Sequence, residues 1–124
     1  MLASILLACE PEPVYTIRFC ESLESGRCAQ DTNTFYLGKR VFVHLSTNQE
    51  FDSPTITGSV YKIAEDGKKA MGKKDFEIEA GTSQIIQDIP FHEFGMGALG
   101  NFEVSFVDQE GEIIVNRRLK IVQP

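Results

Sequence analysis

Short segments of alternating apolar and polar residues recur along the chain, and this two-residue period constrains the fold more than any other feature. Successive side chains of a β-strand point to opposite faces, so such alternation predicts strands with one buried face. In residues 14–19, for example, Tyr15, Ile17 and Phe19 share one face. The same reasoning predicts further strands over residues 40–46, 55–64, 76–79, 84–89, 102–107 and 112–122.

The breaks between these segments are typical of turns. Residues 65–67 and 108–111 each end in glycine, which tolerates the positive φ that tight turns need. No segment between the strands has the period of a long amphipathic helix, and residues 47–51 and 91–96 are long enough only for a helical turn. We therefore expect an all-β fold, an antiparallel β-sandwich of about seven strands. Parallel pairing is not expected, because the crossovers that join neighbouring parallel strands are absent.

Composition and charge narrow the possible partners. A chain of 124 residues has the length of one domain, and nine Phe with no Trp fit a strand-rich core. The formal net charge of −6 predicts a surface that repels a phosphate backbone, so nucleic acid is not an expected partner. The basic pairs at residues 68–69, 73–74 and 117–118 are interpreted as charges that keep strand edges soluble.

The end of the chain resembles the closing hairpin of bacterial immunoglobulin-like domains. In residues 99–104, Gly100 stands two positions before Phe102 at the start of a strand, residues 108–111 turn, and residues 119–122 return. The resemblance implies an immunoglobulin-like sandwich and no activity. An antibody domain proper is disfavoured, because the chain has no Trp and no long-range cysteine pair, and Phe102 stands where many such domains carry a tyrosine.

The segment Leu6-Leu7-Ala8-Cys9, which a Glu-Pro-Glu-Pro spacer follows, resembles the processing site of bacterial lipoproteins. The apolar run is too short to span a membrane, and the basic residues that open a secretory signal are missing. We interpret residues 1–13 as a truncated signal and lipobox with a proline-rich tether. The resemblance implies that Cys9 carries a multi-acyl lipid, which would anchor residues 14–124 in the bacterial cell envelope, on the periplasmic side or the cell surface. The alternative is that residues 1–9 are a first strand or a frayed end.

With Cys9 set apart, the two other cysteines, Cys20 and Cys28, flank a polar loop. In an oxidising compartment such a pair predicts a disulfide, which would pin this loop without holding the whole fold. Two free thiols are an alternative. A zinc site is disfavoured, because such sites generally use two closely spaced ligand pairs and no second pair follows.

No sequence motif predicts catalysis. Residues 95–100 match the G-x-G-x-x-G fingerprint, but that motif must follow a parallel strand and open a helix, whereas a strand follows here. We expect a flexible loop between the sheets instead. No G-x-S-x-G motif occurs, and Asp75, Glu77 and Glu79 have the spacing of a solvated strand face. Neither an enzyme activity nor a cofactor is expected.

Two histidines and a glutamate leave one metal-dependent alternative open. A hydrolytic metal site needs three protein ligands, and His44, His92 and Glu93 would supply them if the strand over residues 40–46 ended near the loop that holds the other two. The alternation within this strand, however, places His44 on the solvent side, and His92 is expected to be a plain loop residue. A metal is therefore not expected.

The predicted function is binding rather than catalysis. We expect a cell-envelope lipoprotein whose immunoglobulin-like domain binds a protein or glycan partner through residues 21–33 or residues 91–101, because a sandwich presents its loops at its ends. The candidate binding residues are Phe91, His92, Phe94 and Met96. The alternatives are an inhibitor or immunity-type module and the small metal-dependent enzyme that would use His44, His92 and Glu93.

Overall fold

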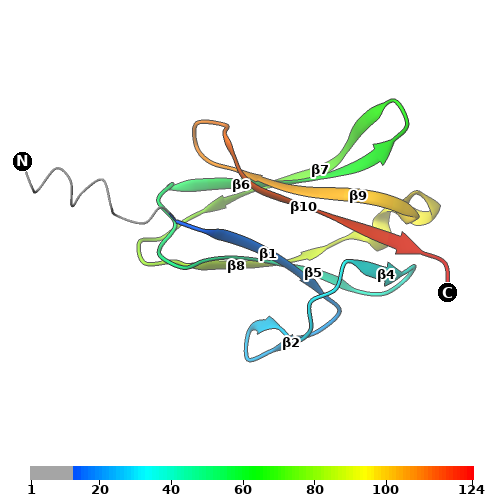
Figure 1. The fold of residues 1–124 in the computed structure, drawn as a ribbon, viewed down its shortest axis with the longest axis horizontal. Coiled ribbons are helices and arrows are strands. Elements are labelled where there is room, and N and C mark those ends of the chain that lie inside the picture. The colour runs from blue at the N-terminus through cyan, green and yellow to red at the C-terminus, as the bar shows by residue number, and fades with distance from the viewer. Residues whose placement is uncertain (1–12) are drawn as a thin grey trace, which may run out of the picture.

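Two sheets packed face to face form the molecule in a computed structural model that describes residues 13–124 (Figure 1). The three-stranded sheet has the order β1 (Tyr15–Cys20), β5 (Val41–Thr47), β8 (Gln84–Ile89). The five-stranded sheet has the order β4 (Thr34–Tyr36), β10 (Ile113–Val122), β9 (Gly100–Val107), β6 (Thr55–Ala64), β7 (Gly67–Glu77). The predicted all-β sandwich is confirmed. Cys9 lies outside the described residues, so its lipidation stays a prediction.

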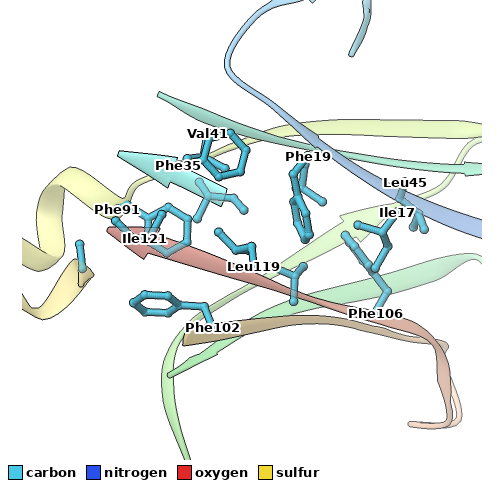
Figure 2. Packing of buried hydrophobic residues seen from close by; sticks show 14 of the residues in the cluster. Ile17, Phe19, Phe35, Val41, Leu45, Phe91, Phe102, Phe106, Leu119 and Ile121 are labelled. Atoms are coloured by element: carbon cyan, nitrogen blue, oxygen red, sulfur yellow. The ribbon is translucent and has the colours of Figure 1, made fainter. Parts of the chain in front are cut away.

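Alternation places one face of each sheet in the core. Side chains such as those of Phe19, Leu45 and Phe106 point into the space between the sheets and are buried (Figure 2). The ring centroid of Phe102 lies 4.9 Å from that of Phe91 in an edge-to-face contact, which closes one end of the core. Alternate residues of the predicted strands therefore make up most of this core, including Ile17, Phe19, Val41, Val43, Leu45, Phe102, Val104, Phe106, Leu119 and Ile121.

The strand β7 is much longer than the four residues 76–79 that alternation predicts. It begins at Gly67, the last residue of the predicted turn, ends at Glu77 and pairs with β6 over its whole length. Most of its side chains are exposed because it is the edge strand of its sheet. An edge strand of this kind has no buried face over most of its length, so the two-residue period is missing, and its four lysines suit an edge that must not pair further.

One parallel pair contradicts the expectation that all pairing is antiparallel. β4 lies parallel to β10, with Phe35 opposite Ile121. The expectation was wrong because it considered only strands that are neighbours in sequence. Here the partners come from opposite ends of the chain, so the rest of the domain serves as their connection and no local crossover is needed.

The connections differ partly from expectation. Residues 91–96 were expected to hold a helical turn, and a 3₁₀ segment, η1 (Phe91–Ala98), is present with a kink at Gly95. Residues 47–51, by contrast, contain no helical turn. No helix within residues 13–124 is long and apolar enough to cross a membrane.

A small hairpin, β2 (Leu23–Glu24) and β3 (Arg27–Cys28), lies against the outer face of the three-stranded sheet (Figure 1). The disulfide between Cys20 and Cys28 is confirmed, with 5.5 Å between the two Cα atoms. It holds β3 against β1 and β5.

The same hairpin covers the face of β5 that carries His44. Its side chain was expected to face solvent, but that was wrong, because the residue is only 2% exposed.

The side of the sandwich where β1 meets β10 is closed by Arg117. Its guanidinium Nη1 donates hydrogen bonds to the carbonyl of Ile17 at 2.9 Å and to Oδ1 of Asp31 at 2.6 Å. The same Asp31 oxygen accepts a hydrogen bond from the N–H of Phe19 at 3.1 Å. Burial alone would raise the pKa of the Asp31 carboxyl, but these hydrogen bonds outweigh it and hold the pKa below its usual value.

We predict that Asp31→Asn lowers the free energy of unfolding by about 1 kcal/mol at neutral pH. The value is modest because the side chains of Arg117 and Asp31 are 29% and 41% exposed. Since the folded pKa lies below the unfolded one, the carboxylate stabilises the fold above pH ~3.9, and this effect is lost as the pH falls through the folded pKa. Urea unfolding of both proteins at several pH values tests this, because their stabilities should converge in strong acid. The exposed pair of Arg40 and Asp88 gives the control, as Asp88→Asn should cost less than about 0.5 kcal/mol.

Candidate functional site

A cleft lies on the other side of the sandwich, between the free edges of β7 and β8. β7 is the outermost strand of the five-stranded sheet and β8 that of the three-stranded sheet. Side chains from these strands, from β6, β9 and η1 surround a volume of about 300 Å³. The cleft reaches the buried residues Val43, Val104 and Phe106. One side of the sandwich is thus closed, and the other opens towards its core.

The interior of the cleft is largely apolar. Its walls include Val60, Met71, Phe76 and Phe94, all partly buried against the core. The strand β6 approaches the floor closely at Gly58, where a Cβ atom would lie 2.9 Å from Cε1 of Phe106. Any larger residue at this position would displace the Phe106 ring, so glycine is what lets β6 and this ring pack together.

Charged side chains of opposite sign stand on the two rims. Lys73 and Lys74 belong to β7, whereas Asp88 and Glu93 come from β8 and η1. Lys74 bridges the opening, because its Nζ donates a hydrogen bond to Oε1 of Gln87 at 3.0 Å. This contact is exposed, so it is weak and can open when another molecule enters the cleft.

The predicted binding residues of η1 separate into different environments. Phe91 is only 4% exposed and packs in the core, so it is not accessible to a partner. Phe94 is half-buried and lines the cleft together with Glu93, whereas His92 is exposed. The side chain of Met96 lies outside the described part of the structure. The segment therefore contributes to a candidate site through Phe94 and Glu93.

The structure does not bring the three candidate metal ligands together. His44 lies under the hairpin on β5, whereas His92 and Glu93 lie in η1. Among residues 13–124, no group of three or more His, Cys, Asp or Glu side chains is placed to hold a metal ion. The metal-dependent alternative is therefore not supported.

Sequence patterns did not reveal the cleft, because its walls come from strands far apart in sequence. The sequence predicts that the lysines of β7 are solvated edge charges, and they are exposed, but Lys73 and Lys74 also stand at the rim of the cleft. The arrangement can hold an apolar group between two charged rims. No protein-family model matches the chain, and no curated protein matches its sequence.

Proposed function

We propose that this protein is a bacterial cell-envelope lipoprotein whose immunoglobulin-like domain binds another protein through the cleft between β7 and β8. The lipoprotein assignment is supported by the sequence that ends in Cys9 and by the proline-rich spacer that follows it. The Cys20–Cys28 disulfide is consistent with an oxidising compartment.

The order of the strands supports an immunoglobulin-like topology. In such domains the first, second and fifth strands share one sheet, and the third, sixth and seventh share the other. β1, β5 and β8 match the first set, and β6, β9 and β10 match the second. β7 then extends the second sheet next to β6, as an additional strand does in variable-type domains.

The observation that carries the binding proposal is an apolar cleft beside an unpaired strand edge. Within residues 13–124, β8 pairs with β5 on one side and with no strand on the other. An extended segment of a partner can add to such an edge through main-chain hydrogen bonds and place every second side chain in a neighbouring pocket. The cleft next to β8 offers that pocket, with apolar walls for one or two large side chains.

The apolar walls favour a protein over a glycan as the partner. Sugar rings carry hydroxyl groups that need hydrogen-bonding partners, and burying them among Val60, Met71 and Phe76 would leave them unsatisfied. The rims add polarity, with Lys73 and Lys74 facing acidic groups of a partner and Glu93 facing basic ones.

The position of the tether agrees with this role. The described chain enters β1 at the end of the sandwich where β5 ends, because Tyr15 lies opposite Thr47. η1 lies at the other end, next to the end of β8 and the start of β9 (Figure 1). A lipid on Cys9 would therefore leave Phe94 and the adjoining part of the cleft directed away from the membrane.

Selection of phage-displayed random peptides on the immobilised full chain tests the binding proposal. We expect enriched peptides that alternate apolar with polar residues, and their binding should shift the NMR signals of β8 and of the cleft walls. Met71→Trp fills the cleft and should weaken this binding by about tenfold or more, a loss of about 1.4 kcal/mol. Ile113→Trp adds the same ring at a residue that is 62% exposed and does not line the cleft, so it should leave binding unchanged.

Peptides that bind Met71→Trp as well as the wild type, or that shift only signals far from β8, would contradict the proposal. Saturable binding to a glycan array without any peptide selection would assign the cleft to the other class of partner. The lipid anchor is tested separately by mass spectrometry of the protein from native membranes, where an N-terminal peptide with unmodified Cys9 would rule it out.

A further inference from the structure

A second cavity, of about 180 Å³, lies on the outer face of the three-stranded sheet. It is separate from the cleft, since the two share no lining residue. β1 contributes Arg18, β3 contributes Arg27, and β5 contributes His44. The other lining residues are Ser46, Thr47, Ser83 and Gln84, so the lining is mainly polar. A liquid water molecule occupies only about 30 Å³, so the cavity has room for a small polar group.

His44 is buried in this lining without a full set of hydrogen bonds. Its Nε2 lies 3.0 Å from Oε1 of Gln84, whereas its Nδ1 has no hydrogen-bonding partner among residues 13–124. Buried polar atoms are nearly always paired, because an unpaired one keeps the cost of losing its water. The imidazole is therefore a buried group that the described residues leave partly unsatisfied.

The two arginines of the lining differ from the other arginines of the described chain. Arg40, Arg117 and Arg118 each pair with a carboxylate. Arg18 and Arg27 form no ion pair or side-chain hydrogen bond within residues 13–124.

The cavity is thus a local concentration of positive charge on an acidic protein. Among residues 13–124, two arginines and no carboxylate line it, whereas the net charge of the chain is −6. Arg18 stands directly opposite His44 in the pairing of β1 with β5. Arg27 precedes Cys28, whose disulfide to Cys20 fixes β3 over the same face. The backbone of both arginines is therefore held by the fold.

We propose that this cavity binds a tetrahedral oxyanion, a phosphate or sulfate group that is either free or part of a larger molecule. Guanidinium groups match such oxyanions because they present several N–H donors in one plane. The hydroxyl groups of Ser46 and Ser83 can add further donors, so the cavity offers more donors than a carboxylate with two oxygens can use.

Binding of the anion should be coupled to uptake of a proton by His44. Burial lowers the pKa of the imidazole, and the charges of Arg18 and Arg27 also lower it, against an opposing effect of the hydrogen bond to Gln84. From β8 the ring faces the uncharged residues Gln84 and Ile86. The negative charge of a bound anion favours the charged imidazole. Since the anion raises the pKa, its affinity should increase as the pH falls through the range between the bound and free values.

NMR titration of the full chain with sodium phosphate and with sodium sulfate, against sodium chloride at equal ionic strength, tests the proposal. We expect saturable shifts of signals from Arg18, Arg27, His44 and Ser83, with tighter binding at lower pH. Arg18→Gln and Arg27→Gln should each weaken binding about tenfold or more. Arg40→Gln, directly before β5 and outside the cavity, should leave it unchanged. The thermal unfolding midpoint of each variant shows that the fold is kept, which is expected because both arginines are exposed.

NMR signals that shift linearly without saturation would overturn the proposal. Equal losses of affinity in Arg27→Gln and Arg40→Gln would also overturn it, because both results would mean that the protein attracts anions only in a general way. Sodium acetate that binds more tightly than phosphate and sulfate would overturn the tetrahedral assignment. If free phosphate or sulfate binds as tightly as a phosphorylated or sulfated sugar, the cavity recognises the oxyanion group itself. If the sugar binds more tightly than the free anion, the cavity recognises the group as part of a larger molecule.

Discussion

Phe102→Ala should lower the free energy of unfolding by about 3–5 kcal/mol, the largest effect that we expect from any single substitution. The residue is completely buried and lies where η1 packs over the end of the core. Its ring makes an edge-to-face contact with Phe91, which in turn makes one with Phe94 at 5.7 Å. Alanine would leave a cavity at this point and remove the support of the segment that lines the cleft.

Urea unfolding, followed by circular dichroism, measures this effect. Ile113→Ala is the control, because Ile113 is 62% exposed and its truncation should change stability by less than about 0.5 kcal/mol. A loss below about 1 kcal/mol for Phe102→Ala would show that η1 and its aromatic side chains close over the gap. The NMR signals of Phe94 report on this rearrangement directly.

Replacing both Cys20 and Cys28 with alanine should lower the free energy of unfolding by about 2–3 kcal/mol. The two cysteines are eight positions apart, and closing a short loop of this length restricts the unfolded chain by about that amount on the chain-entropy model. The variant should also release the hairpin from the outer face of the three-stranded sheet.

The pKa of His44 reports on that release. Burial lowers this pKa in the wild-type protein, so exposure of the ring should raise it towards its usual value near 6.5. An NMR titration of the ring protons measures the change. A reducing agent should produce the same shift in the wild type and no further shift in the variant. An unchanged pKa together with a stability loss below about 0.5 kcal/mol would mean that the hairpin stays in place without its bridge.

Most of the fold was predictable because local patterns determine most of it. β6 and β8 begin and end at the residues that alternation and the bounding turns predict. Each has one face against the core, and that face gives the two-residue period. β7 was missed over most of its length because an exposed edge strand has no such face. β4 was missed because three residues carry too little pattern to be recognised.

The candidate sites were less predictable because they depend on how distant segments pack. The sequence placed His44 correctly on the face opposite Val43 and Leu45, but it could not show that β3 covers that face. Phe91 looked like a loop residue, yet it belongs to the core. The cleft joins β7, β8 and η1 across the gap between two sheets, and no local spacing records that gap.

The parallel pair of β4 and β10 also determines when the fold can be completed. β4 ends at Tyr36, but its partner strand occupies residues 113–122, and Arg117 on the same strand closes the sandwich beside β1. Contacts that join distant parts of a chain form slowly, because a long loop must close before they contribute. A chain that is synthesised N-terminus first therefore cannot give β4 and β1 their final neighbours until β10 has been made.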